Sequence, residues 1–190
     1  MTTQADLVRQ ANAAWAAGLR LLLDGRAEES REQLRAAARL YRESWDAGAP
    51  PDAWGRPIAV LKALLLAGDD AREAAEWTLA TGARDAESPI GRYAATLALL
   101  VLGEDVDARV LGSTLRDRAD FPQAVADALV TLAAADRAGY LLAVEDVLES
   151  FEQRDAYLED VPVADTVLVL QRLAEVRDCT VDLPASALLP

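Results

Sequence analysis

Residues 64–74 read LLLAGDDAREA, and this stretch decides the fold. An apolar run ends at Gly68, and an acidic segment follows it at once. Residues 21–31, LLLDGRAEESR, and residues 99–109, LLVLGEDVDAR, repeat the pattern with Gly25 and Gly103. Residues 131–138, TLAAADRA, form a weaker fourth copy with Ala135 at the glycine position. Glycine readily ends a helix in the left-handed conformation, and acidic residues suit the positive start of the next helix. Each copy therefore predicts two helices joined by a tight turn, at a spacing typical of helix–turn–helix repeats.

Most of the remaining chain shows apolar residues at three- and four-residue spacing, which indicates helices. We expect one all-α domain over residues 1–190 with eight or nine helices in antiparallel hairpins, as an irregular tetratricopeptide- or HEAT-like repeat or a bundle. The return helix after Gly68 is expected to begin at Asp69 or Asp70. The expected hairpins cover about residues 4–47, 54–82, 88–118 and 121–154, followed by a buried helix at about 161–177 and an extended tail.

Composition restricts the function. The chain has 32 acidic and 19 basic residues, a net charge of −13, no histidine and one cysteine, Cys179. Such a negative surface repels nucleic acid and anionic lipid and favours a basic protein partner. Without histidine the usual general base and metal ligand are missing, and one cysteine builds no thiolate zinc site. We therefore expect no enzymatic activity, no cofactor and no metal. No secretory signal or membrane-length apolar run is visible, so we expect a cytoplasmic protein.

Residues 69–73, DDARE, resemble the acidic magnesium motif of isoprenoid-processing helical enzymes. Carboxylates at i and i+4 share one face of a helix and can hold magnesium against a diphosphate. However, no second such motif occurs and no basic cluster lies nearby to hold a diphosphate. The other copies of the repeat also carry acidic residues at this point. The preferred interpretation is a helix start.

In a stack of hairpins the turns align along one edge, where a partner can reach them. Trp45 and Trp54 flank the Gly/Pro-rich loop at residues 46–51, and we expect both to be partly exposed at this loop. The hypothetical partner contacts are Trp54, Asp69, Asp70, Glu73, Glu104, Asp105 and Asp107.

The C-terminal half resembles the Imm49 family of bacterial immunity proteins, which belong to polymorphic toxin systems. The matching segments are Ala134–Leu148 and Val181–Pro190, with Leu189-Pro190 in place of the family's terminal LP. The chain departs from the family at Leu188, where the family has tyrosine, and it lacks the family's histidine-containing segments. The resemblance implies an all-α protein that binds and neutralises a toxin. Two alternatives remain: an adaptor that binds a peptide or regulator in a groove, and a small-molecule binder or helical enzyme with a cavity lined by Trp and Tyr.

Overall fold

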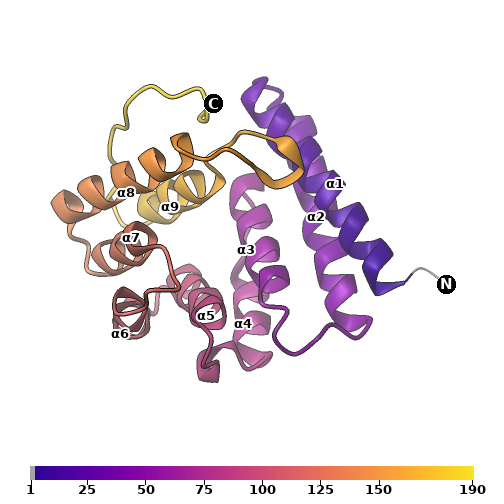
Figure 1. Cartoon of the computed structure of the whole chain (residues 1–190), viewed down its shortest axis with the longest axis horizontal. Coiled ribbons are helices and arrows are strands. Elements are labelled where there is room, and N and C mark those ends of the chain that lie inside the picture. The colour runs from indigo at the N-terminus through magenta and orange to yellow at the C-terminus, as the bar shows by residue number, and fades with distance from the viewer. Residues whose placement is uncertain (1–2) are drawn as a thin grey trace.

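The computed structural model describes residues 3–190, and Figure 1 shows helices joined by turns and loops throughout this range. The expectation of an all-α fold with eight or nine helices is confirmed, since residues 3–190 contain nine α-helices and no strand. Residues 1 and 2, which we include in the expected domain, lie outside the described part. The helices are α1 (Gln4–Leu23), α2 (Ala27–Asp46), α3 (Gly55–Ala67), α4 (Arg72–Ala80), α5 (Pro89–Leu102), α6 (Asp105–Arg116), α7 (Gln123–Ala133), α8 (Arg137–Glu152) and α9 (Asp165–Glu175), with short 3-10 turns η1 (Ala83–Asp85) and η2 (Leu158–Asp160).

The four copies of the sequence repeat form four turns of the same kind. In the second copy Gly68 is left-handed, and the amide of Asp69 donates to the carbonyl of Leu64 at 3.0 Å. In the fourth copy the amide of Asp136 donates in the same way to the Thr131 carbonyl at 2.9 Å. These bonds satisfy carbonyls that the end of a helix leaves free. The residues at the equivalent position are Gly25 (φ 72°), Gly68 (φ 74°), Gly103 (φ 78°) and Ala135 (φ 52°).

The hairpins pack in chain order, with one irregularity at α4. Helix α1 packs along α2, α2 on α3, α5 on α6, α6 on α7 and α7 on α8, whereas α4 packs mainly on α5 and only lightly on α3. The expected start of α4 at Asp69 or Asp70 is wrong, because the helix begins at Arg72. The Asp70 carboxylate accepts a hydrogen bond from the Arg72 amide at 2.9 Å and so serves one of the free donors at this helix start.

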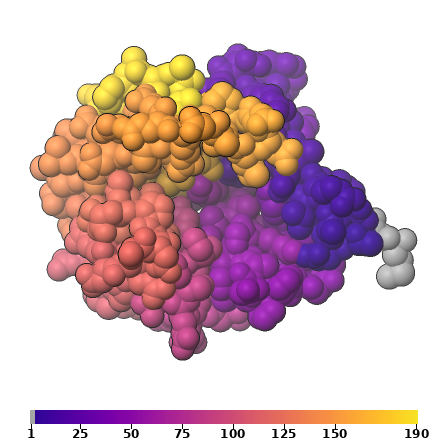
Figure 2. All heavy atoms as spheres, viewed as in Figure 1, coloured from indigo at the N-terminus to yellow at the C-terminus, as the bar shows by residue number. Residues whose placement is uncertain are grey.

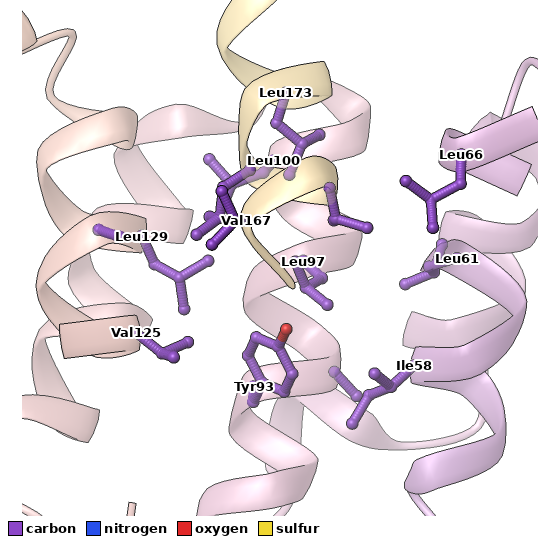
Figure 3. Packing of buried hydrophobic residues seen from close by; sticks show 14 of the residues in the cluster. Ile58, Leu61, Leu66, Tyr93, Leu97, Leu100, Val125, Leu129, Val167 and Leu173 are labelled. Carbon is purple, nitrogen blue, oxygen red and sulfur yellow. The ribbon is translucent and has the colours of Figure 1, made fainter. Parts of the chain in front are cut away.

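Helix α9 covers the inner face of the hairpins. It packs on α3, α7 and α8, and Figure 3 shows Val167 and Leu173 of α9 pointing toward Leu97 and Leu100 of α5. Its start at Asp165 is later than the expected residue 161. Val161 precedes a proline and is extended, with φ −103° and ψ 106°, as residues before proline tend to be. The face that an open groove would offer is therefore filled by the chain's own last helix.

The buried residues form one hydrophobic cluster that includes residues of all nine α-helices. The tail after α9 is neither helix nor strand over residues 179–184 and returns along α8 and α9 (Figure 1). The side-chain amide of Gln171 donates to the Val181 carbonyl at 2.6 Å, and the Ala164 amide donates to the Leu188 carbonyl at 3.0 Å. Figure 2 shows the yellow tail packed beside the orange segment at the end of α8. In the described part of the chain, no helix is both long and apolar enough to cross a membrane.

Candidate functional site

Two repeat turns and the end of α9 meet at one edge of the molecule. We call the set of residues 68–73, 103–107 and 176–177 the turn edge. The Arg72 guanidinium donates to the Leu102 carbonyl at 3.4 Å, which joins the start of α4 to the end of α5. Arg177, directly after α9, donates to the Leu100 carbonyl at 2.6 Å and to the Asp105 carboxylate at 3.1 Å. The structure thus brings together most of the residues that the sequence predicts as partner contacts.

Several of these acidic residues already have an arginine partner within the chain. Asp69 accepts two bonds from Arg35, both of 2.7 Å, and this bidentate pair holds the pKa of Asp69 below its ordinary value. Arg84 lies 3.0 Å from Glu104 and 3.3 Å from Asp107. Asp69, Glu104, Asp105 and Asp107 are therefore all paired within the chain, while Glu104 and Asp107 remain exposed. The cause is that arginines from other elements fold back onto the turns.

Asp70 and Glu73 differ from the other four acidic residues. Both are exposed, and neither forms an ion pair with any residue between 3 and 190. The Asp70 carboxylate accepts a hydrogen bond only from the Arg72 amide. These two carboxylates are the acidic groups of the turn edge that have no ion-pair partner in the described part of the chain.

Trp54 does not belong to the turn edge, and its expected exposure is wrong. Only 8% of the residue is exposed, and its ring centroid lies 5.9 Å from that of Trp45. Trp45 in turn packs edge-on against Trp77 at 6.0 Å. The Trp54 indole also reaches the start of α5, where it lies close to the backbone of Gly91. Trp54 is buried because it anchors the start of α3 against α5 inside the core.

Apolar side chains complete the turn edge. Val106 and Val176 are each 79% exposed, and they are the sequence neighbours of the ion-paired Asp105 and Arg177. A groove of about 280 Å³ lies beside Val176 and is lined by Asp69, Asp70, Leu100 and Leu173 among others. The sequence does not identify Val176 as a surface residue, because Val176 directly follows an apolar helix and looks like its continuation. Val176 is exposed because α9 ends just before it, where this helix meets α5.

The acidic motif DDARE has no metal-binding geometry. Asp69 and Asp70 lie in the turn before α4 and face different partners, Arg35 and the Arg72 amide. The i,i+4 arrangement on one helix face is therefore not formed between Asp69 and Glu73. Within residues 3–190, no group of three or more histidine, cysteine or acidic side chains is placed to hold a metal ion.

A second candidate site is a cavity of about 260 Å³ beneath the segment that joins α8 to α9. Lys62, the single lysine of the chain, lies at this cavity with its ammonium 2.8 Å from the Asp165 carboxylate and 2.8 Å from the Thr166 hydroxyl. Burial lowers the pKa of Lys62, but the charge of Asp165, the nearby Tyr93 and the hydrogen bond to Asp165 together outweigh that effect, and the net pKa lies above the ordinary value. The ammonium is therefore charged at neutral pH. No pattern in the sequence relates Lys62 to Asp165, since they lie on different helices far apart in the chain.

No family model, no curated protein and no solved structure matches the chain. The assignment of both sites therefore rests on their geometry.

Proposed function

We propose that this chain is a non-catalytic protein-binding module that docks a basic protein partner on the turn edge. The observation that supports this proposal is the exposure of Val106 and Val176, each 79% exposed and each the sequence neighbour of one member of the Asp105–Arg177 ion pair. Val176 also continues into the groove lined by Leu65, Leu100 and Leu173, and a contiguous apolar surface with charged groups at its edge is typical of a surface that a partner covers.

The turn edge has the anatomy of a protein interface. An apolar centre surrounded by polar groups is the usual arrangement, and the central residues contribute most of the binding free energy. Val106, Val176 and the adjoining groove form the centre, while Asp70, Glu73, Glu104 and Asp107 form the charged rim. The Arg177 side chain is only 7% exposed and is bonded to α5, α6 and α9, so the centre is ordered before a partner arrives. Pre-ordering lowers the entropy lost on binding.

Charge favours a basic partner. Asp70 and Glu73 carry no ion pair in the described part of the chain, and the whole chain has a net charge of −13. A field of this sign speeds the approach of a positively charged protein and disfavours acidic ones. By the same reasoning, nucleic acid and anionic membranes are not the proposed partners.

The resemblance to bacterial immunity proteins makes a basic toxin the first partner to test. In that case the chain acts in the bacterial cytoplasm and covers the active site of the toxin. The alternative of a peptide-binding adaptor is less favoured, because α9 occupies the inner face of the hairpins on which a peptide would lie.

The test is binding to the purified product of the adjacent gene, in an inactivated form, by calorimetry and stopped-flow kinetics. We expect Val176→Asp to weaken binding by about tenfold or more, mainly through faster dissociation. We expect the double reversal Asp70→Lys with Glu73→Lys to slow association by about tenfold at low salt. The matched control is Asp146→Lys with Glu149→Lys, two exposed carboxylates with the same spacing on α8. The absence of a complex, or equal effects of the two double variants, would contradict the proposal.

A further inference from the structure

The cavity at Lys62 is a separate site that shares no residue with the turn edge. It is enclosed between α1, α3, the end of α8, the start of α9 and the connecting segment 153–164, which we call the strap. Figure 1 shows the strap in orange, reaching from α8 across to α1. The guanidinium of Arg20 on α1 donates to the Glu159 carbonyl at 3.0 Å, and the Tyr157 hydroxyl donates to the Phe151 carbonyl at 2.7 Å. These two bonds hold the strap over the cavity.

Two cations and one carboxylate line this cavity. Lys62 uses two of its three ammonium hydrogens on Asp165 and Thr166, so one donor remains. Arg154 lies over the Phe151 ring with its guanidinium carbon 3.5 Å from the ring centroid. It forms no ion pair or side-chain hydrogen bond with any residue between 3 and 190. The Glu159 carboxylate, on the strap, faces Asn12 of α1 at 3.4 Å instead.

One positive charge is therefore left over in the cavity of a strongly acidic protein. Asp165 balances Lys62 at 2.8 Å, and Arg154 has no such counterpart in the described part of the chain. Arg154 is an exposed residue at the cavity, whereas the Lys62 side chain is only 11% exposed, so the Lys62 ammonium is the donor that water screens least and Arg154 adds a second positive charge beside it. The charge of Arg154 also acts on Lys62 and opposes the rise of its pKa, as expected if the two cations share this cavity.

The remaining walls are apolar. Trp15, Leu19, Phe151 and Val163 line the cavity, and Tyr157 adds a ring whose hydroxyl is already bonded. A volume of about 260 Å³ lies just below the usual range for drug-sized ligands, which begins near about 300 Å³. These side chains can contact a small apolar body, while the polar groups of the cavity can bind its carboxylate.

We propose that this cavity binds a small organic carboxylate, with Arg154 and the free donor of Lys62 on the carboxylate and with Trp15, Phe151 and Tyr157 around its apolar body. The site does not depend on the proposed partner surface, because it lies on different residues.

The strap supplies an entrance. Glu159 and Asp160 both have left-handed backbones, with φ of 53° and 55°. This conformation costs of order 1 kcal/mol for each residue that is not glycine. A strap strained in this way opens more easily than a relaxed loop, and a ligand beneath it adds contacts that favour the closed form.

The experiment uses phenylacetate and hexanoate as probes, each compared with its neutral primary amide, by calorimetry and by tryptophan fluorescence, to which Trp15 contributes. We expect each carboxylate to bind at least about tenfold more tightly than its amide. Amide exchange in residues 155–161 should slow when a carboxylate binds.

Three variants locate the site. Arg154→Gln should weaken carboxylate binding by about tenfold while leaving the amide unaffected. Ala156→Phe, at an exposed position on the cavity wall, should block both probes without burying a new charge. Arg109→Gln is the matched control, since Arg109 is an exposed arginine on α6 that does not line the cavity. The proposal is overturned if no carboxylate binds up to about 10 mM, if the amides bind equally well, or if Arg109→Gln reduces binding as much as Arg154→Gln.

Discussion

The ammonium of Lys62, in the middle of α3, lies 2.8 Å from the carboxylate of Asp165, the first residue of α9. The two side chains are only 11% and 18% exposed, so each depends on the other for the interactions that water would otherwise provide. An ion pair of this kind adds little net stability compared with an apolar pair of similar size, but it is costly to break from one side. Its position therefore fixes how the last helix lies on the inner face of the hairpins.

The Lys62–Asp165 pair predicts a strongly asymmetric set of variants. Lys62→Met should lower the free energy of unfolding by about 3 kcal/mol, because it leaves the Asp165 carboxylate without its partner in a largely buried place. The double variant Lys62→Met with Asp165→Leu should recover most of that loss. Urea unfolding of the two single variants and the double variant measures the coupling. If the double variant loses as much free energy of unfolding as the two single variants combined, the two side chains do not depend on each other in this way.

Ala135 offers a stabilising substitution. It adopts φ 52° at the position where the other three copies have glycine, and a left-handed backbone costs a residue with a Cβ about 1 kcal/mol. Ala135→Gly should therefore raise the free energy of unfolding by up to about 1 kcal/mol, less the greater chain entropy of glycine. The neighbouring Ala134 has a φ of −87°, so Ala134→Gly should destabilise the protein and serves as the control. Equal effects of the two substitutions in denaturant unfolding would argue against this explanation.

These turns were predictable from sequence because their chemistry is local. A glycine after an apolar run ends a helix whatever surrounds it, and even the weak copy at Ala135 adopts the same backbone. The apolar face of α8 was also predicted correctly from the sequence, since Tyr140, Val144 and Phe151 are all buried. In each case, neighbours along the chain decide the outcome.

The contents of the two candidate sites were not predictable, because they depend on contacts between distant elements. Arg35 reaches Asp69 from α2, and Arg177 reaches Asp105 from the end of α9. Trp54 is buried only because α5 packs against the start of α3. Sequence patterns report which face of a helix is apolar, but they do not report which arginine folds onto which acidic turn.

The Arg35–Asp69 pair predicts a dependence of stability on pH. The pair lowers the pKa of Asp69 below its ordinary value of 3.8, so the folded state holds the ionised form more strongly than the unfolded state does. The resulting stabilisation is fully present above the ordinary pKa and is lost as the pH falls through the lowered one. Asp69→Asn should therefore reduce the urea midpoint at pH 7, and this effect should shrink as the pH falls through the lowered pKa and Asp69 becomes protonated in the folded state as well. The comparison is Asp70→Asn, which removes a carboxylate that has no ion pair in the described part of the chain. If the reduction of the urea midpoint in Asp69→Asn is the same in acid as at pH 7, it does not come from the Arg35–Asp69 pair.

Arg177 should be the most sensitive residue of the turn edge. It donates to the Leu173 carbonyl at 2.8 Å and to the Leu100 carbonyl at 2.6 Å, so one side chain serves the ends of both α9 and α5. Arg177→Ala leaves these carbonyls and the Asp105 carboxylate without their donor in a largely buried place. We expect a loss of about 2–3 kcal/mol in the free energy of unfolding. Arg177→Lys should recover only part of it, because a single ammonium does not reproduce the planar guanidinium fork.

The control for the stability effect of Arg177 is Arg172→Ala on the same helix. Arg172 is 46% exposed and pairs with Glu175 one turn away, so its removal should change stability by less than about 0.5 kcal/mol. The proposed partner surface gives a second measurement, since Val106 and Val176 keep their relative position only while Arg177 joins α9 to α5 and α6. Arg177→Ala should therefore weaken the complex under conditions in which the variant is still fully folded, whereas Arg118→Ala, which removes a partly exposed arginine paired with Asp120 beyond the other end of α6, should not. An Arg177→Ala variant that is less stable but binds with unchanged affinity would place the docking surface elsewhere.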